Sequence, residues 1–104
     1  MKHTDLEKRL EQELLEASNL CRAKYKYNPS RFLQMMKAEG AVKTSIKLVM
    51  APTYHEGLTR LWELERLDLT VEAIIIREPY SELFPEEVVN KAKEKLKQLG
   101  YSSI

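Results

Sequence analysis

Apolar residues recur every three or four positions along most of the chain, and this spacing favours helices over strands. The clearest stripe runs through the first quarter of the sequence, at Leu6, Leu10, Leu14, Ala17 and Cys21. Similar stripes follow in residues 41–50 and 85–99. Each stripe gives one apolar side to a helix, so several helices of this kind can enclose a common core.

One run, residues 67–71, alternates between apolar and polar side chains as a strand does. No second run of this kind exists for it to pair with, and a lone strand is not stable. We therefore predict a turn there, capped by Asp68 or Thr70, which leads into a short helix through Ile76.

Capping residues and helix breakers divide the chain. Asn28-Pro29 predicts the start of a helix, because asparagine caps well and proline suits the first helical position. Gly40 predicts the end of that helix, and residues 41–50 the next one. Thr53 and Glu56 have the spacing of a capping box, which predicts a further helix start.

These segments predict an all-α fold, a compact single-domain bundle of about five to six short helices. The domain covers residues 1–104, with a long N-terminal helix over 1–26 and a compact helical core over 28–104. A chain of 104 residues suits one domain, and its one cysteine can form no internal disulfide. There is no apolar run of a signal peptide or of a membrane span, so we expect a cytoplasmic protein without membrane contact.

Residues suited to catalysis or metal binding are few. His55-Glu56 begins like a zinc-protease signature, but Thr59 stands where the second histidine is needed. Cys21 lies on an apolar stripe, which predicts a buried, inert thiol. We expect a protein that is not an enzyme, with no catalytic, cofactor-binding or metal-binding residues and no cofactor.

If the chain were an enzyme, two polar groups would have to converge in a pocket. The three side chains that we would inspect first are Asp68, Glu72 and His55.

Charge is unevenly distributed along the chain, although the net charge is only +1. Residues 22–50, the basic segment, contain seven basic residues and one acidic residue, a net of +6. Residues 51–90, the acidic segment, contain three basic and nine acidic residues, a net of −6. Tyrosines alternate with bases in the basic segment, which suits phosphates and nucleobases. The residues expected to bind nucleic acid or an acidic partner are Arg22, Lys24, Tyr25, Lys26, Tyr27, Arg31, Lys43 and Lys47.

Two other interpretations of the basic segment stay open. Its side chains can be merely solvated, or they can pack against the acidic segment. The nucleic-acid interpretation has a further basis, since the helices on either side of Gly40 resemble a helix-turn-helix, with Val42, Lys43, Thr44 and Lys47 on the recognition helix. Glu39 departs from that motif, because an apolar residue is expected there.

A second dense feature lies in the acidic segment. Trp62 and Arg66 are one helical turn apart, so the guanidinium can stack on the indole, and Glu63 can pair with Arg66. Tryptophan and arginine are favoured interface anchors, which makes Trp62, Arg66 and Asp68 candidates for contact with another protein. The alternative is that Trp62 belongs to the core and Asp68 caps a helix.

The run from Leu61 to Glu72, L-W-E-x-x-R-L-D-L-T-V-E, resembles a family of small uncharacterised bacterial and phage proteins. The similarity extends to Tyr27-x-Pro29-x-x-Phe32 and Leu99-Gly100-Tyr101, and it covers about residues 25–101. The resemblance implies a bacterial or phage-borne protein, loosely associated with mobile DNA or defence. It implies no activity, cofactor or catalytic residue.

The sequence therefore predicts a non-enzymatic helical module that binds another protein, in a bacterial or phage defence, counter-defence or nucleic-acid-associated complex. The partner is not identified by the sequence, and a homodimer stays open. The alternative is a small DNA- or RNA-binding protein that uses the helix-turn-helix-like segment 22–50.

Overall fold

The computed structural model describes the backbone of residues 2–101 and the side chains of residues 5–101. Within these residues the chain is helical and contains no strand. The elements are α1 (Lys2–Tyr25), α2 (Ser30–Glu39), α3 (Ala41–Met50), α4 (Glu56–Glu63), the 3-10 turn η1 (Leu67–Leu69), α5 (Val71–Ile75), the 3-10 turn η2 (Tyr80–Leu83) and α6 (Glu86–Gln98). The predicted all-α bundle is confirmed.

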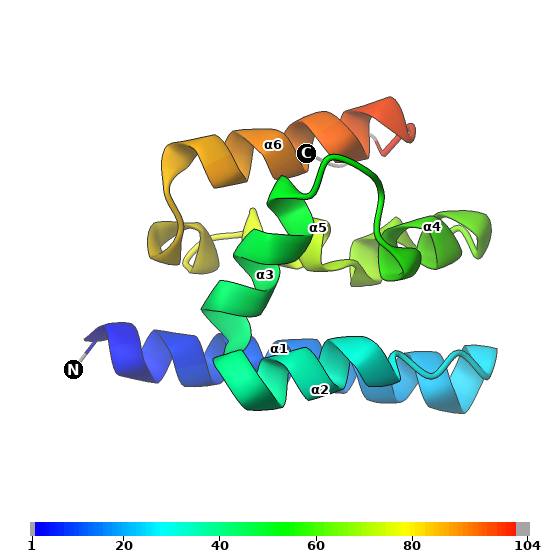
Figure 1. The fold of residues 1–104 in the computed structure, drawn as a ribbon, viewed down its shortest axis with the longest axis horizontal. Helices are drawn as coiled ribbons and strands as arrows, with labels where there is room; N and C mark the ends of the chain where they lie inside the picture. The colour runs from blue at the N-terminus through cyan, green and yellow to red at the C-terminus, as the bar shows by residue number, and fades with distance from the viewer. Residues whose placement is uncertain (1, 102–104) are drawn as a thin grey trace.

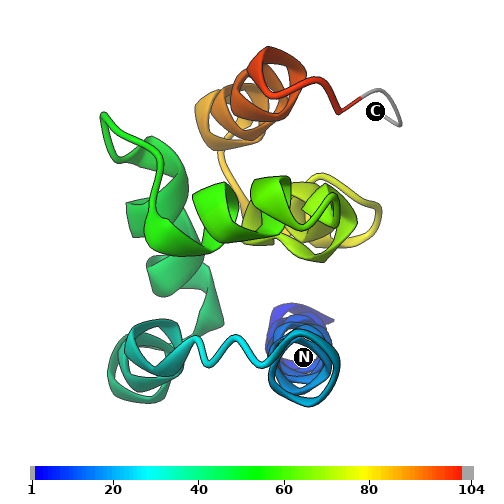
Figure 2. The ribbon, with the colours of Figure 1, turned by 90° about the vertical axis from the view of Figure 1, so that its right-hand side faces the viewer.

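The helices form three layers (Figures 1 and 2). α1 and α2 lie side by side and antiparallel in one outer layer, and α6 forms the other. α4, α5 and the two 3-10 turns fill the space between these layers. The radius of gyration is 12.6 Å, close to the roughly 13 Å expected of a compact chain of this length.

α3 crosses the layers and holds them together (Figure 1). It contacts α1, α2, α5 and α6. A single residue, Gly40, separates α2 from α3, and its φ of +90° is a conformation that glycine adopts readily. α3 occupies residues 41–50 as the sequence predicts.

The core has a larger and a smaller part. The larger part is built mainly from α1, α3, α5 and the start of α6, and its buried residues are Leu10, Leu14, Met36, Ala41, Val49, Val71, Ile74, Ile75, Tyr80, Phe84, Val88 and Ala92. The smaller part joins α4 to α6 through Leu58, Leu67, Ala73 and Leu96. The predicted stripe of α1 faces this core, with Cys21 also buried.

Two predicted helix starts are wrong in detail. α2 begins at Ser30, with Pro29 in the capping position and no side-chain cap from Asn28. α4 is capped by His55, whose Nδ1 accepts a hydrogen bond from the Leu58 amide, and the predicted Thr53 capping box does not form.

The prediction for residues 67–71 is confirmed. They form η1 and the first turn of α5, and Thr70 caps that helix by accepting a hydrogen bond from the Ala73 amide at 3.1 Å. α5 ends at Ile75, one residue before the predicted end.

Candidate functional site

A polar network joins the end of α1 to the segment that follows α4. The Arg66 guanidinium donates to the Tyr25 hydroxyl at 2.5 Å and to both carboxylate oxygens of Asp68 at 3.1 Å. It also lies 5.7 Å from the centre of the Tyr25 ring, and Lys24 lies 5.6 Å from that ring. The contact connects two groups of candidate residues that are 41 positions apart in the sequence.

This network keeps both charged groups ionised. The hydrogen bonds that Arg66 donates, first to Asp68 and second to Tyr25, raise the pKa of Arg66 above its usual value. In turn, the hydrogen bond from Arg66 holds the pKa of Asp68 below its usual value of 3.8. At neutral pH the pair is therefore a fixed bidentate ion pair.

Trp62 is exposed, so the alternative that placed it in the core is wrong. Its relative exposure of 48% is the highest among the large apolar side chains described. The predicted stacking of Arg66 on the indole is replaced by the Tyr25 contact, and Glu63 pairs with Arg60 at 3.9 Å instead of with Arg66. An exposed tryptophan on the last turn of a short helix is available to a partner.

The seven bases of the basic segment are all exposed. Among the described residues, ion pairs within 4.0 Å include Lys47 with Glu39, inside the basic segment, but none joins this segment to the acidic one. Direct packing of the basic segment against the acidic segment through ion pairs is therefore not found there.

The candidate residues fall into two places. The α1–α2 connection and the end of α4 lie at the same end of the molecule, on the right of Figure 1 and facing the viewer in Figure 2. We call Lys24, Tyr25, Lys26, Trp62 and Arg66 the aromatic-basic end. Lys43 and Lys47 lie on α3, which crosses the middle of the molecule in Figure 1.

The structure does not have the geometry that the helix-turn-helix interpretation predicts. Thr44, predicted to lie on the recognition helix, has no exposed surface, and α3 is packed against four other helices. The one-residue connection at Gly40 is also shorter than the usual turn of three to four residues. α3 is a core helix with Lys43 and Lys47 on its outer side.

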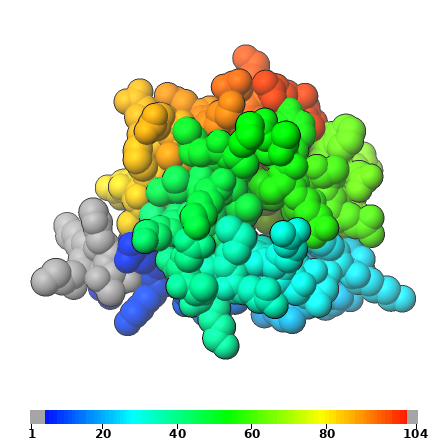
Figure 3. Space-filling model, in the orientation of Figure 1, coloured from blue at the N-terminus to red at the C-terminus, as the bar shows by residue number. Residues whose placement is uncertain are grey.

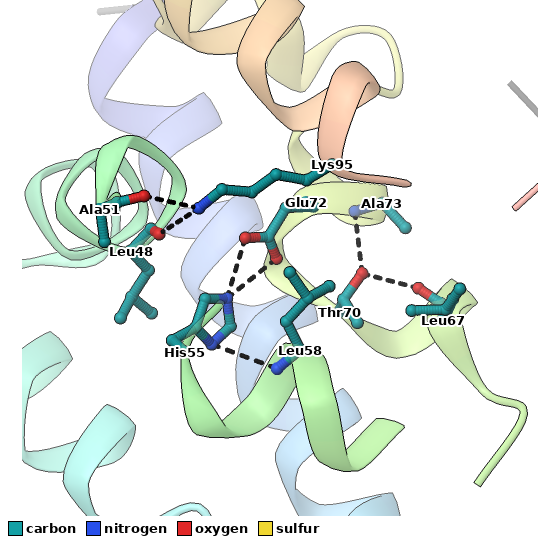
Figure 4. Close-up of polar contacts among 9 residues, drawn as sticks. All are labelled: Leu48, Ala51, His55, Leu58, Leu67, Thr70, Glu72, Ala73 and Lys95. Atoms are coloured by element: carbon teal, nitrogen blue, oxygen red, sulfur yellow. Dashed lines mark hydrogen bonds and ion pairs between the residues drawn. The ribbon is translucent and has the colours of Figure 1, made fainter. Parts of the chain in front are cut away.

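His55 and Glu72, two of the three side chains singled out as a catalytic set, do meet (Figure 4). His55 Nε2 lies 2.9 and 3.1 Å from the two carboxylate oxygens of Glu72, which has no exposed surface. Because the Leu58 amide donates to Nδ1, the proton is on Nε2 and is donated to Glu72. Both ring nitrogens are thus occupied, and the pair fixes α4 against α5. Asp68, the third side chain, is engaged by Arg66 instead.

Lys95 is an unexpected part of this buried cluster. It is 3% exposed and donates to the carbonyl oxygens of Leu48 and Ala51, at 3.3 and 3.0 Å, around the end of α3 (Figure 4). Burial lowers the pKa of Lys95, and the negative charge of Glu72 partly offsets that effect. The positive charge of Lys95 thus stabilises the C-terminus of α3, although Lys95 lies near the C-terminus of its own helix, α6.

A cavity of about 320 Å³ opens beside His55. Figure 3 shows a hollow between the cyan side chains of the α1–α2 region and the green segment around residue 55. The side chains around it come from α1, the α1–α2 connection, α2, α3, α4, η1 and α5, and most are apolar. They are Leu14, Ala17, Ser18, Cys21, Tyr27, Pro29, Arg31, Phe32, Met35, Leu48, His55, Glu56, Gly57, Leu61, Leu69, Thr70 and Val71.

Sequence reasoning missed this cavity, and it missed the buried role of Lys95. A signal for Lys95 existed, since it lies three residues after Ala92 and directly before Leu96 on the buried stripe of α6. In the part of the chain that the structure describes, no cluster of three or more metal-ligating side chains occurs. No helix there has the length and apolar character to cross a membrane.

Comparisons of the chain with protein-family models, with curated proteins and with solved structures gave no match. The resemblance of the run from Leu61 to Glu72 to a bacterial and phage family thus stays a prediction.

Proposed function

We propose that the protein is a non-enzymatic binding module that docks onto another protein through its aromatic-basic end. The observation that carries this proposal is the exposure of Trp62, the single tryptophan of the chain, next to the preorganised Arg66–Tyr25 contact. Trp, Tyr and Arg are the residue types that dominate the binding energy of protein interfaces.

The two exposed lysines of this end, Lys24 and Lys26, favour an acidic patch on the partner, while the exposed Glu63 and Glu65 beside Trp62 favour a basic one. Arg66 is paired with Asp68. Such complementarity speeds association and selects partners, while the aromatic groups supply affinity. A place in a bacterial or phage defence or counter-defence complex belongs to the same proposal and rests on the resemblance alone.

The proposal is tested by capture with the immobilised protein in its wild-type, Trp62→Ala and Met50→Ala forms. Met50 is a matched control, because it is also an exposed apolar side chain but lies at the end of α3. A partner captured by wild type and Met50→Ala but lost with Trp62→Ala is then purified. We expect Trp62→Ala to weaken its binding about tenfold or more in calorimetry.

Equal affinity of wild type and Trp62→Ala for the purified partner would refute docking at this end. Since only about half of Trp62 is covered, its replacement is expected to change the free energy of unfolding by about 1 kcal/mol, and urea unfolding of both proteins measures this change. A loss of binding is then not explained by a loss of folding.

The second candidate is binding of DNA or RNA by the basic segment, favoured by the exposure of all seven of its bases. Fluorescence anisotropy with duplex and single-stranded probes at two salt concentrations tests it, because phosphate contacts weaken steeply with salt. The buried Thr44 moves the expected contacts away from α3 and towards the α1–α2 connection.

Two double variants separate these surfaces. Lys24→Glu/Lys26→Glu is expected to abolish binding of the probes, and Lys43→Glu/Lys47→Glu is expected to weaken it to a smaller extent. A larger loss with Lys43→Glu/Lys47→Glu would instead indicate that α3 contacts the nucleic acid. Absence of binding at low salt would remove this candidate.

A further inference from the structure

The cavity beside His55 has the size and lining of a small-molecule site. Its volume of about 320 Å³ lies at the lower end of the roughly 300–1,000 Å³ of ligand pockets. Apolar side chains such as Leu14, Phe32, Met35 and Val71 form most of its wall. An apolar hollow of this size exposes its wall to water, so an apolar occupant that displaces the water stabilises the complex.

Most polar side chains around the cavity are already bonded to the protein. Ser18 donates to the Leu14 carbonyl at 2.9 Å, and Thr70 donates to the Leu67 carbonyl at 2.6 Å. Both nitrogens of His55 are occupied by Glu72 and Leu58. The polar groups that remain in the wall are those of Tyr27 and Cys21, with Arg31 and Glu56 at the exposed mouth. The Tyr27 hydroxyl lies within hydrogen-bonding reach of the Glu56 carboxylate, and its oxygen can still accept a hydrogen bond from a ligand.

The interior of the cavity is uncharged at neutral pH. Burial raises the pKa of the Cys21 thiol. Burial is also the main reason that the pKa of Tyr27 is raised, and the nearby Glu56 carboxylate raises the pKa of Tyr27 further. Arg31 and Glu56 at the mouth carry opposite charges, so the entrance favours neither a cation nor an anion. A charged ligand would lose its hydration inside without gaining an ionic partner.

Gly57 keeps space open at the polar part of the wall. A β-carbon at this position would lie 3.4 Å from the His55 ring and 3.6 Å from the Tyr27 hydroxyl oxygen, at ordinary contact distance. The φ of Gly57 is not positive, so its backbone does not require glycine. Glycine within a helix costs about 1 kcal/mol relative to alanine. Here it leaves the Tyr27 hydroxyl reachable from the cavity.

We propose that this cavity binds a small uncharged molecule that is apolar over most of its surface and carries one hydrogen-bonding group, which meets the Tyr27 phenol. The ligand lies between α1, α2 and the start of α4. This inference does not depend on the proposed docking of a protein at the aromatic-basic end.

The full chain is titrated with three probes of one shape: p-phenylphenol, biphenylcarboxylate and biphenylmethylammonium. Calorimetry gives the affinity. The rate at which iodoacetamide alkylates Cys21 gives the location, because Cys21 is the only cysteine of the chain and lines the cavity. We expect p-phenylphenol to bind and to slow alkylation, and both charged probes to bind about tenfold more weakly or worse.

Two variants test whether p-phenylphenol binds inside this cavity. Ala17→Met fills the cavity from α1 and is expected to weaken p-phenylphenol binding about tenfold. Ala38→Met makes the same change at an exposed position of α2 outside the wall, and is expected to leave the affinity unchanged.

Tyr27→Phe removes only the hydroxyl and keeps the aromatic ring. It therefore tests the site even if Ala17→Met does not fold. It is expected to weaken the binding of p-phenylphenol severalfold and to leave that of biphenyl, which lacks the hydroxyl, unchanged. The proposal is overturned if p-phenylphenol neither binds nor protects Cys21, if a charged probe binds more tightly, or if both Ala17→Met and Tyr27→Phe bind as wild type does.

Discussion

Single buried polar groups decide much of the local stability of this protein. Lys95 is the clearest example, because its ammonium group donates hydrogen bonds to two carbonyl oxygens around the end of α3. These carbonyls belong to residues more than 40 positions earlier in the sequence. Thr44 and Ser45 are the opposite case: their hydroxyl groups are buried and make no hydrogen bond within the described residues. Replacing Lys95 should therefore lower the free energy of unfolding, and replacing Ser45 should raise it.

Lys95→Met should lower the free energy of unfolding by about 2 kcal/mol at neutral pH, since it leaves the Leu48 and Ala51 carbonyls without their donor. Urea unfolding monitored by circular dichroism measures the change. Stability close to that of wild type would show that water replaces the ammonium group.

The pH dependence of this difference has a defined sign. Burial lowers the pKa of Lys95 in the folded state below 10.5, so the unfolded chain binds this proton more tightly. Wild type should therefore gain stability relative to Lys95→Met as the pH rises through the lowered folded-state pKa towards 10.5. A difference that shrinks over this range would contradict the assignment.

Ser45→Ala should raise the free energy of unfolding by about 1 kcal/mol, because it removes a buried hydroxyl that has no partner. The small side chain still allows α3 to approach its neighbours closely. Destabilisation by this substitution would indicate a hydrogen-bond partner for the hydroxyl in solution.

At the scale of elements, local rules predicted where helices lie better than how they begin. Residues 41–50 form α3 as expected, and the run 67–71 becomes a capped turn followed by α5. The Thr53 capping box failed because His55, two residues later, takes the capping position and is held there by Glu72. That choice depends on a residue of another helix, which local spacing does not report.

The cap of α5 can be tested through Thr70. Thr70→Ala should lower the free energy of unfolding by about 1–2 kcal/mol, because the Ala73 amide loses its acceptor in a buried place. Thr70→Ser keeps the hydroxyl and is expected to recover most of the loss. Equal destabilisation by both substitutions would assign the effect to the methyl group instead of the cap.

At the scale of the whole molecule, charge follows the layers. The basic segment lies in the α2 layer and in α3, whereas much of the acidic segment lies in the middle layer (Figure 1). The described ion pairs do not join these two segments directly. Their attraction acts at longer range, which salt screens effectively.

We therefore expect the free energy of unfolding to fall by about 0.5–1 kcal/mol between low salt and about 0.5 M NaCl. Urea is the denaturant of choice, because it adds no ions. Lys24→Gln/Lys26→Gln should show a weaker dependence on salt, and an equal or steeper dependence would contradict a role for these charges.

The sequence predicted the class of fold but only part of the candidate site. It singled out Trp62, Arg66 and Tyr25 by residue type, yet the contact between Arg66 and Tyr25 depends on the end of α1 lying beside the segment that follows α4. The cavity was beyond prediction, since its wall combines side chains from positions 14 to 71. Such convergence is a property of tertiary packing and leaves no local pattern.

The position of Trp62 has a practical consequence for spectroscopy. Since about half of the only indole of the chain is already in contact with water in the native fold, its emission should change less on denaturation than that of a buried tryptophan. A blue shift would instead signal that another surface has covered it. Intrinsic fluorescence is thus a poor gauge of denaturation for this molecule and a label-free gauge of complex formation.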